Sequence, residues 1–131
     1  MIAREVAIRL TVGEVMLRRP KTLDPAATVA DLRRLFENDN VRTALLVDGA
    51  TLVATVDQDD VPASAGTGEP ALTFARYDAE RVGPEVPVRD VVDLLERTRQ
   101  GRLVVVAGDG TTLLGLLCLS GVDDAFCSGG E

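Results

Sequence analysis

Three aspartates, Asp57, Asp59 and Asp60, stand together at the end of an apolar run of the sequence. Carboxylate oxygens are the ligands that Mg²⁺ and other hard cations prefer, and such a cation could act on a phosphate ester. Against this hypothesis, the sequence offers no further ligand or general base beside the cluster. Acidic residues between a strand and a helix also interact favourably with the helix dipole. A cation site and a structural role are therefore both open.

The sequence contains no histidine, although it carries 21 acidic and 14 basic residues. Histidine is the commonest general base and zinc ligand, so Ser-His-Asp and Cys-His catalysis within this chain are excluded. Lys21 is the lone lysine, and no neighbour in the sequence would activate it as a Schiff-base nucleophile. The net charge of −7 would repel a phosphate backbone. We therefore expect a protein that uses no histidine-based catalysis of its own and does not bind nucleic acid.

The two cysteines lack the spacing of a metal site or of a disulfide framework. We expect Cys118 to be a free buried thiol that packs as a small apolar side chain, and Cys127 to lie in a flexible tail of residues 127–131. The chain also shows no apolar run typical of a signal peptide or a membrane span. The expected location is the cytoplasm, without membrane association.

Two stretches of the sequence occur twice, which indicates an internal repeat. Residues 22–32 resemble residues 81–91, with Asp31 matching Asp90, and residues 48–53 resemble residues 109–114, with Asp48 matching Asp109. The second copy gains two residues, Ala107 and Gly108, at a predicted turn. Turns tolerate such insertions and strands do not, so the alignment is consistent with a structural repeat.

Each copy predicts one helix followed by a hairpin of two aliphatic strands. Thr28 is a good N-cap for the first helix, and Gly101 suits the end of the second. Apolar residues recur at helical spacing, as Val29, Leu32, Leu35 and Phe36 in the first copy and as Val88, Val91, Val92 and Leu95 in the second. Asp48-Gly49 and Asp109-Gly110 are strong hairpin signals between the aliphatic runs that follow.

Neither copy can bury both faces of its own sheet, so the two are expected to pack sheet to sheet. The predicted organisation is a first repeat at residues 9–64, a linker at 65–70 and a second repeat at 71–126. The linker is where small and helix-breaking residues concentrate. The seam between paired repeats is the place where a small ligand is expected.

The order of these motifs resembles the cystathionine-β-synthase (CBS) domain. The resemblance runs from Thr11-Val12-Gly13-Glu14-Val15-Met16 through Thr22-Leu23 and residues 27–32 to Leu46-Val47-Asp48-Gly49 and Asp60, and the second half repeats it. The whole is therefore similar to a tandem CBS pair, or Bateman module. The resemblance implies an α+β fold of two β-α-β-β-α repeats, a regulatory role without catalysis, and homodimers.

The resemblance also implies a ligand chemistry, because family members bind AMP, ADP, ATP or S-adenosylmethionine. An aspartate after the last strand accepts hydrogen bonds from the ribose diol, and a Ser or Thr three residues earlier approaches the phosphates. In the first repeat these positions are Asp60 and Asp57; in the second they are Gly121 and Cys118. An ionised Asp57 about 4 Å from a phosphate would cost about 4 kcal/mol at the effective dielectric of a protein surface.

Arginines supply the positive charge that a phosphate needs, since a guanidinium matches phosphate geometry. Arg42 and Arg102 precede the two hairpins, and Arg81 replaces Thr22 in the second repeat. The predicted ligand-binding residues are Thr22, Arg42, Asp57, Asp60, Arg81 and Arg102. Structural alternatives remain open, namely surface arginines and an Asp60 that caps a short helix begun by Pro62.

Two functions follow from the resemblance. The first is a regulatory CBS pair that senses an adenosine-type ligand, needs no cofactor and reports to a partner that the sequence does not identify. The alternative is a degenerate pair that serves only as a dimerisation or protein-interaction module, because Asp57, Cys118 and Gly121 depart from the family pattern.

Overall fold

The computed structural model describes residues 1–98, 100–121 and 123–127 and divides into two units. The inner unit is the continuous segment Lys21–Ala79. The split unit joins Met1–Pro20 to the residues from Glu80 onward. Each unit has its own sheet and its own apolar core.

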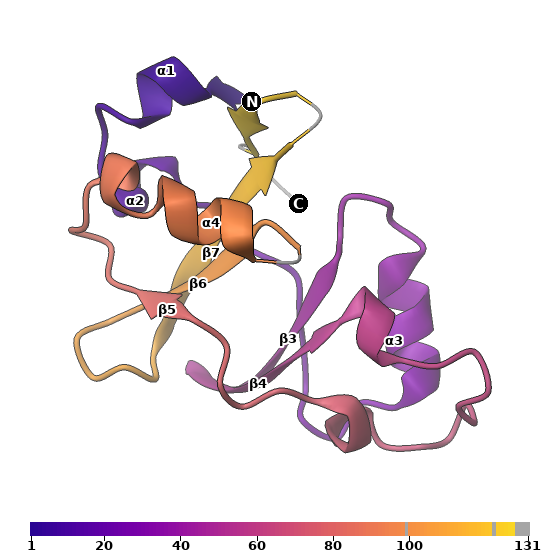
Figure 1. Cartoon of the computed structure of the whole chain (residues 1–131). Coiled ribbons are helices and arrows are strands. Elements are labelled where there is room, and N and C mark those ends of the chain that lie inside the picture. The colour runs from indigo at the N-terminus through magenta and orange to yellow at the C-terminus, as the bar shows by residue number, and fades with distance from the viewer. Residues whose placement is uncertain (99, 122, 128–131) are drawn as a thin grey trace. The chain divides into compact units, whose positions relative to one another are not determined.

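The inner unit contains a three-stranded sheet of order β2-β3-β4 (Figure 1). Its strands are β2 (Thr22–Leu23), β3 (Thr43–Asp48) and β4 (Thr51–Asp57). β2 pairs parallel with β3, and β3 pairs antiparallel with β4 through the predicted Asp48-Gly49 turn, where Gly49 has a φ of 63°. That left-handed conformation favours glycine, which confirms the hairpin prediction.

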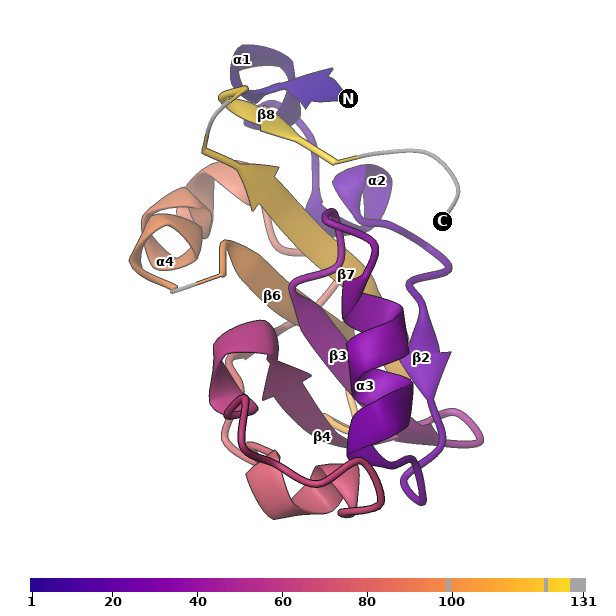
Figure 2. The same ribbon diagram turned by 90° about the vertical axis from the view of Figure 1, so that its right-hand side faces the viewer.

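Helix α3 (Val29–Phe36) covers one face of this sheet (Figure 2). Thr28 is its N-cap, as predicted: the Asp31 N–H donates to Thr28 Oγ1 (3.4 Å), and the Thr28 N–H donates to Asp31 Oδ2 (2.9 Å). This capping box satisfies backbone donors that have no partner inside the helix. Leu32 is fully buried against Leu46 and Val56 of the sheet, so the apolar stripe packs where its spacing predicted.

The split unit contains a five-stranded sheet of order β1-β8-β7-β6-β5. Its strands are β1 (Ile2–Ala3), β5 (Arg81–Val82), β6 (Arg102–Val106), β7 (Leu113–Ser120) and β8 (Ala125–Phe126), and its helices are α1 (Arg4–Ala7), α2 (Val12–Val15) and α4 (Val92–Arg97). Helix α4 lies across β6 and β7 in Figure 1. The topology of β5, α4, β6 and β7 repeats that of β2, α3, β3 and β4, which is the predicted repeat.

The helix of the second copy begins differently from that of the first. Pro87 stands where the first copy has Thr28, so no side chain caps the turn, and a 3₁₀ turn, η3 (Val88–Asp90), precedes α4. Val88 and Leu95 are nevertheless fully buried. The prediction that Gly101 ends this helix is wrong, because α4 ends at Arg97 with the extended Thr98 as its C-cap, and Gly101, with a φ of 67°, lies directly before β6. The second helix is thus both uncapped by a side chain and shorter than the first, with six residues against eight.

The last helix of each predicted β-α-β-β-α unit takes another form. After β4 the chain makes the 3₁₀ turns η1 (Gln58–Asp60) and η2 (Ala71–Phe74), and after β7 it returns as strand β8. Ser64, Gly66, Gly68 and Pro70 stand in the segment between the two 3₁₀ turns, and these residue types disfavour a helix. The predicted helix beginning at Pro62 is therefore absent among the described residues.

The two units do not follow the order of the repeats along the chain. The motif Thr11–Met16 opens the first repeat in the sequence, but α2 packs in the split unit with the second sheet, where Val12 and Val15 are buried. The segment 65–70 belongs to the inner unit, where the Val29 N–H donates to the Glu69 carbonyl (2.9 Å). The repeat boundaries 9–64, 65–70 and 71–126 remain a prediction about the sequence.

Candidate functional site

The candidate site begins at the end of the β3–β4 hairpin. The strand register places Thr43 opposite Asp57, and Thr43 Oγ1 donates a hydrogen bond to Asp57 Oδ1 over 2.8 Å. Thr43 is one of two buried polar residues in the structure's described part, since only 8% of it is exposed. A buried hydroxyl needs a partner, and the Asp57 carboxylate supplies it.

The turn η1 brings the carboxylate of Asp60 to the same place. Asp57 is the residue that precedes this turn, and its N–H donates to Asp60 Oδ2 over 3.0 Å. Asp60 therefore points back along the chain toward the end of β4. The alternative prediction, that Asp60 caps a helix begun by Pro62, is wrong, because no such helix forms and Asp60 is the third residue of η1.

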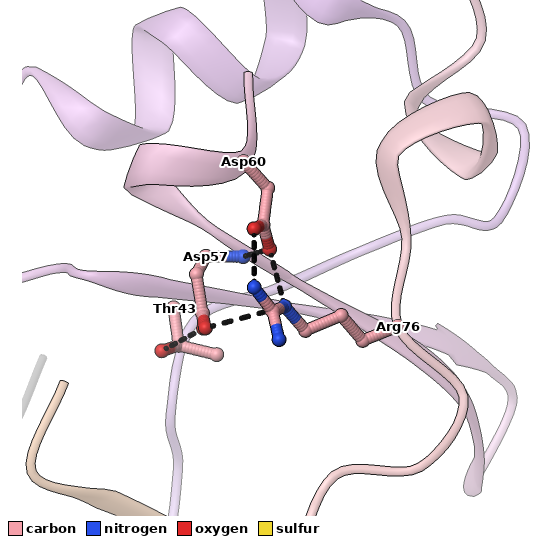
Figure 3. Close-up of polar contacts among 4 residues, drawn as sticks. All are labelled: Thr43, Asp57, Asp60 and Arg76. Carbon is pink, nitrogen blue, oxygen red and sulfur yellow. Dashed lines mark hydrogen bonds and ion pairs between the residues drawn. The ribbon is translucent and has the colours of Figure 1, made fainter. Parts of the chain in front are cut away.

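Arg76 completes the cluster, as Figure 3 shows. Its Nε donates to Asp60 Oδ2 (2.8 Å) and its Nη2 to Asp60 Oδ1 (2.7 Å), which is a bidentate pair. Nε also lies 3.7 Å from Asp57 Oδ2. The backbone holds Arg76 against β4, because Arg76 and Thr55 exchange two backbone hydrogen bonds of 2.7 and 2.9 Å.

The electrostatics of the cluster keep the Arg76 guanidinium charged. Hydrogen bonding to Asp60, and then the charge of that carboxylate, raise the pKa of the Arg76 guanidinium above its usual value, and Asp57 adds to the effect. The Asp60 side chain is 14% exposed and the Arg76 side chain 45%, so solvent screens the pair from one side. A pair of this exposure contributes about 1 kcal/mol or less. Backbone pairing with Thr55 positions Arg76, and the ion pair with Asp60 adds little to the stability of the fold.

This arrangement defines what Asp60 can do chemically. A carboxylate that accepts two parallel N–H donors from a guanidinium can instead accept two hydroxyl groups of a diol. Arg76 therefore donates to both of the oxygens that a diol would use. It also sets a positive charge beside Asp57, the residue at which the sequence predicted repulsion of a phosphate.

Two further predicted residues belong to the same unit. Arg42 is exposed immediately before β3, and its carbonyl accepts from the Gln58 N–H (2.9 Å), which places its backbone beside the start of η1. Thr22 is exposed in β2, where it pairs with Leu45 of the central strand β3. Their roles in ligand binding remain predictions.

Arg81 and Arg102 lie in the split unit, and both donate to loop carbonyls. Arg81 Nη1 donates to the carbonyl of Gly110 in the β6–β7 turn. Arg102 Nη1 donates to the Gln100 carbonyl over 2.8 Å. These contacts give both arginines a structural role in loops, and their role toward a ligand also remains a prediction.

The second-repeat counterpart of Asp57 is part of a disulfide. Cys118, opposite Arg102 in the β6–β7 register, is bonded to Cys127, and the Cys127 N–H donates to the Cys118 carbonyl over 2.8 Å. The prediction of a free Cys118 thiol and of Cys127 in a flexible tail is wrong, because β8 folds back along β7 and brings the Cα atoms within 5.3 Å. The other tail residues, 128–131, lie outside the described residues.

The cation hypothesis gains no ligand set from the structure. Asp57 and Asp60 point into the cluster with Thr43 and Arg76, whereas Asp59 is exposed. Within residues 1–98, 100–121 and 123–127, no group of three or more acidic, histidine or cysteine side chains is arranged to hold a metal ion. Lys21 lines a separate hollow of about 290 Å³, together with Leu23, Asp31, Arg34, Leu35 and Asn38.

Thr43 and Arg76 are the two site residues that the sequence did not predict. Thr43 could have been found by counting back through the Asp48-Gly49 hairpin, although a register shift between Leu46 and Val47 moves the pairing by one residue. Arg76 lies in an irregular segment with no periodicity, so nothing in the sequence places it beside Asp60. It arrives there through its backbone pairing with Thr55, a tertiary contact.

Comparison with known proteins identifies the family. The sequence profile of the CBS domain matches residues 12–61 and 74–126, and this chain therefore belongs to the CBS-domain family, as a tandem pair. No curated protein sequence matches it. Among the described residues, no helix is both long and apolar enough to cross a membrane.

Solved structures with this fold include two similar proteins. A putative acetoin utilization protein (AcuB) from Vibrio cholerae is 26% identical, with a TM-score of 0.72 and 82% of each chain covered. The CBS-pair protein CBSX2 from Arabidopsis thaliana, in a crystal structure with AMP, is 26% identical with a TM-score of 0.72, over 88% of this chain and 92% of that one.

Proposed function

We propose that this chain is a non-catalytic regulatory CBS pair that senses an adenosine-type ligand. Membership of the family and the likeness to CBSX2, whose structure contains AMP, support this proposal. The observation that carries it is the Asp60 carboxylate, set after β4 with both oxygens aligned for two adjacent donors. Asp60, Thr22 and Arg42 would contact the ligand in the first repeat, and Asp57 would lie nearest its phosphates.

Calorimetric titration with AMP, ATP and S-adenosylmethionine tests the proposal. We expect Asp60→Ala to weaken binding at least tenfold, because the ribose diol loses its acceptor. Asp59→Ala is the matched control, since it removes the same charge from an exposed neighbour, and it should leave the affinity unchanged. The absence of heat with all three ligands, or equal affinities of wild type and Asp60→Ala, would reject the site.

A second candidate is a degenerate pair that acts only in dimerisation or protein interaction. Two observations favour it: Arg76 and Thr43 already engage Asp60 and Asp57, and Cys118 is in a disulfide where the second repeat would need a hydroxyl. A thermal-shift screen that stays flat across adenine compounds, together with light scattering that reports a stable homodimer, would establish this function instead.

The predicted cytoplasmic location needs a separate test. Part of its basis was the expectation of free cysteines, and the Cys118–Cys127 bond removes that part, because disulfides persist mainly in oxidising compartments. Cell fractionation of the native protein, with its thiols alkylated at lysis, would decide both the location and the redox state there.

A further inference from the structure

Arg76 occupies the carboxylate that the proposed ligand needs. Its two donors, Nε and Nη2, lie 2.8 and 2.7 Å from the two oxygens of Asp60. A carboxylate has about four lone-pair sites. Arg76 takes two of them and the Asp57 N–H takes a third at Oδ2, so a ribose diol, which needs two, cannot bind Asp60 while Arg76 is paired with it. Any ligand that uses Asp60 must therefore displace Arg76.

Displacement leaves a charged guanidinium that needs a new partner. Because its pKa is raised, the Arg76 guanidinium stays protonated, and its positive charge would lack an anionic partner after displacement. Water can solvate it, since the side chain is 45% exposed, but water does not replace a bidentate anionic partner. A ligand phosphate would replace it, because its oxygens match the guanidinium fork.

Asp57 also affects phosphorylated and uncharged ligands differently. Its carboxylate accepts from Thr43 and lies 3.7 Å from Arg76 Nε. With Arg76 nearby, the charge of Asp57 is offset and a phosphate can approach. Without Arg76, the carboxylate would repel a phosphate and would not affect an uncharged ligand.

We propose that Arg76 makes this site select phosphorylated adenosine ligands over uncharged ones, by competing with the ribose for Asp60 and then pairing with the phosphate. The inference rests on the proposed function and goes beyond it. It favours AMP or ATP over adenosine, which carries no anionic group that could replace the Asp60 carboxylate. Arg76 is a specificity residue, and Asp60 is the ribose acceptor.

The side chain of Arg76 can be changed without removing its segment. The two hydrogen bonds between Arg76 and Thr55 are made by backbone atoms, and η2 before it packs through Ala71, which is fully buried. Arg76→Ala should therefore fold, and its thermal melt verifies this. Arg76→Lys keeps the charge but not the fork. Arg34→Ala is the matched control, because Arg34 is exposed on α3 of the same unit and carries the same charge.

The experiment measures the affinity of AMP and adenosine for wild type and for these three variants by calorimetry. We expect wild type to prefer AMP at least tenfold. Arg76→Ala should reduce that preference at least tenfold, with adenosine binding tighter and AMP weaker, because the competitor and the phosphate partner disappear together. Arg76→Lys should fall between the two, and Arg34→Ala should match wild type.

The possible failures are distinguishable. If Arg76→Ala leaves the ratio of the AMP and adenosine affinities as in wild type, Arg76 does not select the ligand, although the site itself still binds it. If Arg34→Ala reproduces the change of ratio, the effect is one of net charge and the inference is wrong. If neither compound binds to any of the four proteins, this inference is rejected, and the proposed function falls as well only if ATP and S-adenosylmethionine also give no heat with wild type.

Discussion

At the scale of single residues, carboxylates stabilise local structure in this chain before any ligand is considered. Asp31 and Glu14 accept backbone N–H groups in the caps of α3 and α2, and Asp109 accepts from Thr111 and Thr112 in the β6–β7 turn. Asp60 follows the same pattern toward Asp57. Some of the carboxylates behind the net charge of −7 therefore act as short-range hydrogen-bond acceptors for nearby N–H groups.

These acceptors predict how stability depends on pH. Hydrogen bonds from the Thr112 side chain and from the backbone of Thr112 and Thr111 lower the pKa of Asp109 from 3.8 to about 2, and the Thr28 backbone N–H lowers that of Asp31. A pKa depressed by folding gives stability that is full above about pH 4 and is lost as the pH falls toward 2. We expect Asp109→Asn to reduce that acid-induced loss, measured as the free energy of unfolding in urea between pH 2 and 7.

The control for this prediction is Asp39→Asn, which makes the same change of charge in an exposed loop. This control distinguishes the effect of losing the acceptor in the turn from the effect of changing the net charge of the protein. An acid slope in Asp109→Asn as steep as that of wild type would show that the turn contributes nothing to the pH dependence.

At the scale of elements, the two hairpins are alike in topology and differ in what packs on them. The N-terminal segment lies close to the backbone of the β6–β7 hairpin, because Leu17 and Leu116 exchange two backbone hydrogen bonds of 2.9 and 3.0 Å. Gly115 lies beside this contact and is buried. The N-terminal segment can reach β7 because that position has no side chain.

Gly115→Ala should therefore destabilise the protein. A Cβ at this position would overlap the Leu17 carbonyl oxygen and lie 2.7 Å from Met16 Sδ, so the backbone contact must open. We expect a loss of about 1–3 kcal/mol in the free energy of unfolding, measured by urea denaturation. Gly108→Ala is the control, because a Cβ there meets nothing within 4 Å. Equal effects of the two changes would contradict the prediction.

At the scale of the whole molecule, the chain builds one unit from its two ends and the other from its middle. The N-terminal segment supplies Ala7, Val12 and Val15 to the core of the split unit. Backbone hydrogen bonds join it to the segment before α4, among them Val12 N–H to the Val86 carbonyl and Val88 N–H to the Leu10 carbonyl. Unit and repeat are thus different divisions of the same chain.

This division predicts the effect of removing residues 1–20. The split unit would lose two fully packed valines, each worth about 1.5–3 kcal/mol of burial, and the inner unit would lose none of its core. Hydrogen exchange should show lost protection in β6 and β7 and retained protection in β3 and β4. Val6→Ala is a control at an exposed N-terminal position. Equal protection of β6 and β7 with and without residues 1–20 would show that these residues do not stabilise the split unit.

The elements that depend on local chemistry and spacing could be predicted from the amino-acid sequence. The Thr28 cap, the two Asp-Gly hairpins and the repeat itself were predictable, because caps, turns and apolar periods are set by neighbouring residues. The carboxylate pair Asp57 and Asp60 was found through its position in the repeat. The CBS family followed from the order of these motifs.

The contacts between groups that are far apart in the chain could not be predicted in this way and became visible in the folded structure. Arg76 reaches Asp60 by pairing with β4, Cys127 reaches Cys118 by the return of β8, and the N-terminal segment joins the second sheet rather than the first. Each contact depends on irregular or very short segments, whose local sequence carries no period. Their positions are set by the packing of the cores they border, so the partners of Asp60 could not be read from the sequence.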